Sequence, residues 1–196
     1  MSPITLTPHL ARRMARSACY LGAAAAAGLV AIGAFTTISP GPDTFHTTGD
    51  YLLTADGIPF MLGPLLLLPA LRTLRTGPGS RLTQAGMWPT AAGATVLLAM
   101  FVWGLITADG GSWGPTYPLA VLATIAGVAL FAAGFWKDRT LPRWLVVAWP
   151  VAWLLGIAPV GPGFAPLALT AVYLVMAHTP PIRRQTQSAD AAPAHL

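Results

Sequence analysis

The sequence predicts an all-α membrane protein, a bundle of six transmembrane helices with its N-terminus and C-terminus in the cytoplasm. The composition is 55% hydrophobic and only 9% charged, whereas a soluble domain is about a quarter charged. The eleven Lys and Arg residues fall in four short segments that are separated by long apolar stretches. Six spans would place all four segments on one side of the plasma membrane, as the positive-inside rule requires. The basic segments contain Arg12, Arg13 and Arg16; Arg72, Arg75 and Arg81; Lys137, Arg139 and Arg143; and Arg183 and Arg184.

The first predicted helix follows three arginines and contains a run of Ala and Gly. Its apolar stretch is about 20 residues, enough to cross about 30 Å of hydrocarbon, whereas the apolar region of a signal peptide has about 7–15 residues. We therefore expect an uncleaved transmembrane helix. Residues 1–16 are predicted as a basic cytoplasmic tail and residues 179–196 as a disordered cytoplasmic tail. The six helices of the transmembrane domain, residues 17–178, are predicted over residues 17–38, 50–71, 84–106, 117–136, 142–157 and 164–178.

The connections between the helices alternate in charge. Residues 39–49, 107–116 and 158–163 contain no Lys or Arg and are predicted to be external. The connections at residues 72–81 and 137–143 carry the basic residues and are predicted to be cytoplasmic. The fifth and sixth helices are short for a full span, so the charge pattern is the main reason to place them in the membrane.

Asp56 is the first candidate for a functional residue. It lies about two turns inside the second predicted helix, between Tyr51 and an apolar run. A charged carboxylate costs about 2.5–3.5 kcal/mol at the centre of a bilayer, so such a residue faces the bundle interior, stays protonated or serves a function. The alternative is that the helix begins near Gly57 and Asp56 is an N-terminal cap in the headgroup zone.

A second candidate is the external group formed by Asp43, His46 and Asp50. Spacings of three and four residues would align these side chains on one face if the helix extended outward. Asp and His together can hold a divalent metal or relay a proton. Asp109 in the next external connection is a candidate to complete the group. The alternative, a solvated loop without a ligand, is favoured because Gly41 and Pro42 lie just upstream and Thr47–Thr48–Gly49 interrupts the pattern.

A third feature is the density of proline in the second and fifth helices. Pro59, Pro64 and Pro69 are predicted to break the second helix, and broken helices mark many transport sites. The alternative is that they lie in an ordinary span, because transmembrane helices also tolerate proline. In the fifth helix, Trp149 and Trp153 are one turn apart near the middle of the bilayer. They are candidates to line an aromatic pocket for an apolar ligand, and packing against neighbouring helices is the favoured alternative.

Several functions lack support in the sequence. It contains no P-loop, dinucleotide fingerprint, zinc motif or nucleophile elbow, so we expect no cofactor and no resident metal. The cations flank apolar segments and form no stripe with interleaved aromatic residues, so nucleic acid is not an expected partner. The expected partner is the lipid bilayer. The small-residue pairs Ala24/Gly28 and Ala123/Gly127 pack helices within the chain, or alternatively join it to a second copy or a membrane partner protein.

One segment resembles a known group of proteins. Leu141-Pro142-Arg143-Trp144-Leu145, with the helix start at Tyr117–Leu119 and the basic turn at Lys137–Arg139, resembles small uncharacterised actinobacterial multi-pass membrane proteins. Those proteins carry an LPRWL-type segment at the start of a late helix. The resemblance implies a membrane bundle, and it brings no assigned activity or catalytic residue.

Three functions remain open at this stage, and whether the protein is an enzyme is among the open questions. The leading hypothesis is a small membrane component that binds or transports a small apolar or protonatable molecule through Asp56 and the proline-rich helices. The first alternative is an integral-membrane enzyme that acts on a lipid-like substrate, with Asp43, His46, Asp50 and Asp56 at its outer face. The second is a structural or accessory subunit of a membrane complex.

Overall fold

The computed structural model describes residues 7–39, 44–74, 81–110, 114–138, 141–157 and 165–179. In these residues the chain forms six α-helices, so the all-α prediction is confirmed. The helices are α1 (Pro8–Phe35), α2 (Thr48–Leu74), α3 (Arg81–Thr107), α4 (Thr116–Asp138), α5 (Arg143–Ile157) and α6 (Ala165–His178).

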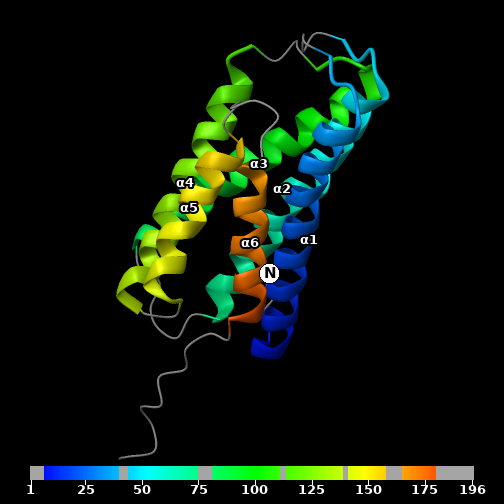
Figure 1. Ribbon diagram of the computed structural model, residues 1–196. Coiled ribbons are helices and arrows are strands. Elements are labelled where there is room, and N and C mark those ends of the chain that lie inside the picture. The colour runs from blue at the N-terminus through cyan, green and yellow to red at the C-terminus, as the bar shows by residue number, and fades with distance from the viewer. Residues whose placement is uncertain are drawn as a thin grey trace, which may run out of the picture.

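The helices form an elongated bundle in which consecutive helices run in opposite directions (Figure 1). Each helix packs against its neighbours in the sequence, and α6 returns to pack against α1, which closes a ring of six helices. One end of the bundle, which we call the basic end, therefore contains the first residues of α1, α3 and α5 and the last residues of α2, α4 and α6. We call the opposite end the acidic end.

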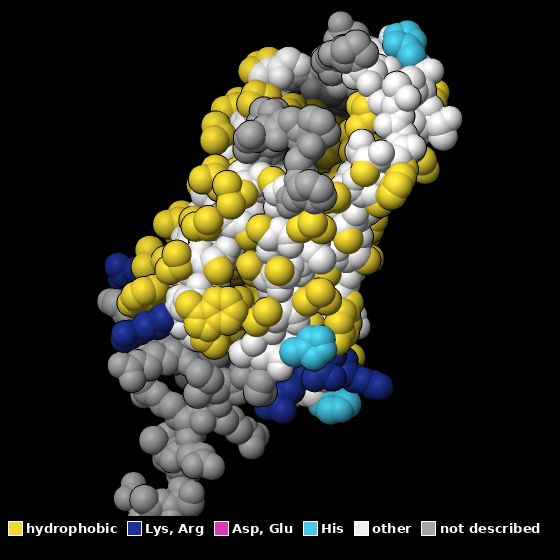
Figure 2. Space-filling model, viewed as in Figure 1, with side chains coloured by type: hydrophobic (Ala, Val, Ile, Leu, Met, Phe, Trp, Pro, Cys, Tyr) yellow, Lys and Arg dark blue, Asp and Glu magenta, His cyan; other side chains and the backbone are white. Residues whose placement is uncertain are grey.

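The Lys and Arg residues of the described helices gather at the basic end, where Asp138 ends α4. Arg72 lies in the last turn of α2, and Arg81 and Arg143 begin α3 and α5, so all three lie at the basic end. Figure 2 shows Lys and Arg only at this end of the visible face, below sides that are mostly hydrophobic. Asp50 and Asp109 lie at the acidic end, near the start of α2 and just after α3.

Four helices, α1 to α4, are long and apolar enough to cross a membrane. The apolar part of the shortest, Thr116–Trp136, has 21 residues, which corresponds to about 31 Å of helix at about 1.5 Å per residue. Helices α5 and α6 are apolar but have only 15 and 14 residues, and each spans about 22 Å or slightly less. The chain thus has the composition and helix lengths of a membrane-embedded protein.

The start of α1 differs from the prediction. Helix α1 begins at Pro8, so the basic residues from Arg12 onward are helical and residues 1–16 are not a tail as a whole. The Thr7 side chain accepts a hydrogen bond from the backbone N–H of Leu10 at 3.4 Å, and Pro8 occupies the first helical position. Both features favour helix initiation and were visible in the sequence.

The end of α1 also differs from the prediction, because the helix ends at Phe35, three residues early. The hydroxyl and the backbone N–H of Thr36 both donate to the carbonyl of Ile32, at 2.6 and 2.9 Å. Thr36 itself has an extended backbone, so the chain leaves the helix there.

Helices α3 and α4 approach closely through small residues. A Cβ atom on Gly86 would overlap the backbone of α4 at Gly127, and a Cβ atom on Gly127 would overlap Thr90. The buried hydroxyls of Thr90 and Thr124 donate to the carbonyls of Gly86 and Ala120, one turn earlier, both at 2.8 Å. Small residues that allow backbone contact, with hydroxyl groups satisfied locally, are typical of helix pairs in membranes.

Candidate functional site

Asp50 is buried at the start of α2, and its carboxyl group accepts four hydrogen bonds. Oδ1 accepts from the backbone N–H of Ser39 at 2.9 Å, and Oδ2 accepts from the Ser39 hydroxyl at 2.7 Å. Oδ2 also accepts from the backbone N–H groups of His46 and Thr47, at 3.0 and 2.9 Å. In return, the Thr47 hydroxyl accepts from the N–H of Asp50 at 3.3 Å. This reciprocal arrangement is a capping box, so Asp50 closes the start of α2.

The predicted alignment of Asp43, His46 and Asp50 on one helix face is wrong, because α2 begins at Thr48. His46 precedes the helix, its side chain is exposed, and its Nε2 lies 2.7 Å from the hydroxyl oxygen of Thr44. Asp43 lies outside the described residues. His46 and Asp50 are therefore linked through the His46 backbone, and their side chains do not share a helical face.

The helix does not extend outward because the connection from α1 folds back onto its first turn. The Thr47 hydroxyl donates to the carbonyl of Thr37 at 2.6 Å. Gly49 lies against the same carbonyl so closely that a Cβ atom would overlap it. The capping box of Asp50 and this contact hold the end of α1 and the start of α2 together.

Asp109 lies just after α3, where Ala108 has a positive φ of 56°. The carbonyl of Ala108 accepts a hydrogen bond from the N–H of Phe45 at 2.9 Å, so the two connections at the acidic end touch. Among the described residues, no group of three His, Cys, Asp or Glu side chains lies close enough to hold a metal ion. In that part of the chain, His46, Asp50 and Asp109 therefore do not assemble into a metal-binding group.

Asp56 lies inside α2, as its ninth residue, so the alternative in which the helix starts at Gly57 and Asp56 caps it is wrong. It lies about 12 Å along the helix axis from Thr48, at about 1.5 Å per residue. Its carboxyl group rests on Gly28 of α1, where a Cβ atom would lie 2.7 Å from Oδ1. The side chain is half-buried, and Oδ2 is buried without a hydrogen-bond partner among the described residues.

The prolines of α2 do not break the helix. Pro59, Pro64 and Pro69 all lie inside a helix that runs without interruption from Thr48 to Leu74. Each proline lacks the N–H that would pair with a carbonyl one turn earlier. For Pro59 that carbonyl belongs to Ala55, the residue before Asp56. The carbonyl of Ala55, in the same helical turn as Asp56, therefore lacks its usual helical donor.

Trp149 and Trp153 are both fully buried in the centre of the ring. The Trp149 ring packs edge-on against Phe131 of α4 at a centroid distance of 6.2 Å, and the Trp153 ring packs against Phe60 of α2 at 5.3 Å. Trp153 Nε1 donates to the hydroxyl of Tyr173 in α6 at 3.1 Å. Trp149 Nε1 is buried without a partner in the described part of the chain. These contacts agree with the packing interpretation.

The sequence analysis did not predict the contacts of two residues in this region, Gly28 and Tyr173. Gly28 was paired with Ala24, but Ala24 is exposed and the group that faces Gly28 is the carboxyl group of Asp56. Tyr173 was not singled out, although a tyrosine in the middle of an apolar helix needs a partner for its hydroxyl when buried. That requirement was the available signal for the contact with Trp153.

The candidate site is thus the carboxyl group of Asp56, which rests on Gly28 between two long apolar helices. The other acidic residue of α2, Asp50, is engaged in capping the helix. This arrangement can bind a proton or a positively charged group, because it supplies one acceptor in an apolar environment. Comparisons of the chain with protein-family models, with curated proteins and with solved structures give no match.

Proposed function

We propose that the chain is an integral protein of the plasma membrane that crosses the membrane six times, with both termini in the cytoplasm. The gathering of Arg72, Arg81 and Arg143 at the basic end supports this orientation through the positive-inside rule. Helices α5 and α6 complete the ring between α4 and α1, which supports counting them as spans despite their length. A local thinning of the bilayer accommodates short spans at modest cost.

Within this class, we propose that the protein binds or transports a small protonatable molecule at Asp56. The observation that carries the proposal is the buried Oδ2 atom without a hydrogen-bond partner. A buried carboxylate without a partner is costly, so the group is either protonated or paired with a cation from outside the chain. An amine with a short apolar tail supplies both the charge and the apolar surface that such a position requires.

The enzyme alternative has weaker support. It requires several acidic residues to converge on one pocket at the acidic end. Asp50 is instead committed to the capping box, and the described residues contain no cluster of three potential metal ligands. We therefore do not propose catalysis.

The proposal is tested by the thermal stability of the purified protein in detergent with n-hexylamine or 1-hexanol. The amine should raise the melting temperature of the wild type and of Asp138→Asn, because a cation that binds the folded state stabilises it. It should not raise that of Asp56→Asn, which keeps the shape of the side chain but loses the negative charge. 1-Hexanol, which has the same apolar tail and no charge, should change the melting temperature of all three proteins by the same amount. An equal response of Asp56→Asn and wild type to the amine would refute a binding role for Asp56.

A further inference from the structure

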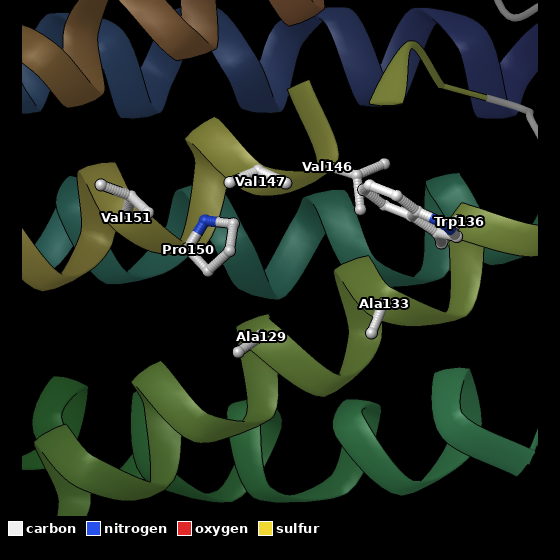
Figure 3. Close-up of a pocket in the computed structure, with 7 residues that line it drawn as sticks. All are labelled: Ala129, Ala133, Trp136, Val146, Val147, Pro150 and Val151. Carbon is white, nitrogen blue, oxygen red and sulfur yellow. The ribbon is translucent and has the colours of Figure 1, made fainter. Parts of the chain in front are cut away.

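An apolar groove lies between α4 and α5 on the outer surface of the bundle. Its volume is about 360 Å³, within the range of about 300–1,000 Å³ that is common for small-molecule sites. Trp136 and Val146 lie at one end of the groove and Val151 at the other (Figure 3). The lining residues are Ala129, Ala133 and Trp136 of α4 and Val146, Val147, Pro150 and Val151 of α5.

The groove exists because small side chains on α4 face a proline on α5. Ala129 and Ala133 are one turn apart and leave room that larger residues would fill. The groove opens away from the core, since Val147 and Val151 on its rim are about half exposed, at 50% and 47%. In a membrane-embedded bundle, this surface faces the lipid chains.

A cation stands at the basic end of the groove. Arg143 is exposed and is the first residue of α5. Its guanidinium carbon lies 5.6 Å from the ring centre of Trp136, which lines the groove. No ion pair with Arg143 occurs among the side chains that the structure describes.

We propose that this groove binds an anionic phospholipid, with one acyl chain along Ala129 and Ala133 and the phosphate on Arg143. The apolar lining fits a hydrocarbon chain, and the guanidinium matches a phosphate group geometrically and in charge. Basic pockets between transmembrane helices at the membrane surface bind anionic lipid headgroups by the same combination. The site requires that the protein lies in a membrane, and it is independent of the role of Asp56.

The test compares two lipids with identical acyl chains, phosphatidylglycerol and phosphatidylcholine, added in equal amounts to the full-length protein in detergent. Native mass spectrometry counts the lipids that remain bound. The wild type should retain phosphatidylglycerol about fivefold better, the ratio that corresponds to one Lys or Arg contact with an anionic lipid. Arg143→Gln should abolish this preference. Ala133→Leu, which fills the groove, should reduce the binding of both lipids.

Two matched variants separate the site from general effects. Arg81→Gln removes another exposed arginine that begins a helix at the basic end, and Ala126→Leu adds the same volume at an exposed position of α4 outside the groove. Both should bind lipid like the wild type. The proposal is overturned if the wild type shows no preference, or if Arg81→Gln loses it as Arg143→Gln does. It is also overturned if glycerol phosphate, which has no acyl chain, displaces phosphatidylglycerol from the protein.

Discussion

Asp50 and Asp56 are both aspartates of α2, six residues apart, but only the carboxyl group of Asp50 is surrounded by hydrogen-bond donors. The carboxyl group of Asp50 accepts four hydrogen bonds from three residues at the acidic end. The carboxyl group of Asp56 rests on Gly28, and its Oδ2 is buried with no partner in the described part of the chain. The sequence shows two acidic residues near the start of one apolar helix, and only the structure separates them.

The difference separates a structural role from a candidate functional one. Four donors on Asp50 match the acceptor capacity of an ionised carboxylate, so folding stabilises this group and the group stabilises the fold. Asp56 receives no such compensation, and its burial opposes folding. A polar group that costs stability between apolar helices is a candidate for binding, because acidic residues inside membrane helices commonly serve a function.

The largest expected effect belongs to Asp50. Asp50→Ala should lower the free energy of unfolding by about 2–3 kcal/mol, because it removes a helix cap and leaves the partners of the carboxyl group unpaired. Unfolding by SDS in mixed micelles, followed by circular dichroism, measures this change. Asp50→Asn keeps one accepting oxygen and should lose about 1 kcal/mol, the value of one or two hydrogen bonds. If Asp50→Ala is as stable as the wild type, the capping box contributes nothing to stability, and the contrast between Asp50 and Asp56 is refuted.

The fold class and the cap of α2 were accessible from the sequence. The spacing of the basic segments and the apolar stretches predicted six helices, because hydropathy and charge placement are local properties of the chain. Thr47 and Asp50 also match the spacing of a capping box, with an acidic residue three positions after a threonine and before an apolar run. The interpretation of Asp50 as a metal or proton ligand overlooked that local pattern.

The environment of Asp56 could not be predicted in the same way. Its contact with Gly28 depends on the rotation and the axial register of α2 against α1. That register follows from all the side chains at the interface together, including the contact of Gly63 with Gly22, and not from a pattern in either helix. The groove between α4 and α5 depends in the same way on how two helices meet.

The two buried tryptophans allow the same comparison, between a buried polar group with a partner and one without, for uncharged groups. Trp153 Nε1 donates to Tyr173, whereas Trp149 Nε1 lacks a partner among the described residues. Both replacements by Phe remove buried volume, but Trp153→Phe should cost about 1 kcal/mol more because it also removes a hydrogen bond in the bilayer. The same SDS titration measures the difference. In a Tyr173→Phe background the difference should disappear, and its persistence there would assign it to packing alone.

Gly28 tests how the carboxyl group of Asp56 is accommodated. Gly28→Ala should cost about 1 kcal/mol, because the new methyl group meets Oδ1 and forces the side chain to turn. In an Asp56→Ala background the same change should be nearly neutral, which gives a coupling free energy of about 0.5–1 kcal/mol in a double-mutant cycle. Gly33→Ala is the matched control, since a Cβ atom there meets nothing within 4 Å. Equal costs of Gly28→Ala in both backgrounds would show that the two residues do not touch.

The smallest expected effect is the most informative for function. Asp56→Asn should change the free energy of unfolding by less than about 0.5 kcal/mol, or raise it, because removing a buried charge that lacks a partner is commonly neutral or stabilising. The same substitution at Asp50 should destabilise the protein, so the two variants form a matched pair on one helix. A loss at Asp56 as large as the loss at Asp50 would mean that the carboxyl group of Asp56 holds the bundle together. A neutral result, combined with a lost response to hexylamine, would show that this carboxyl group is retained for binding and not for folding.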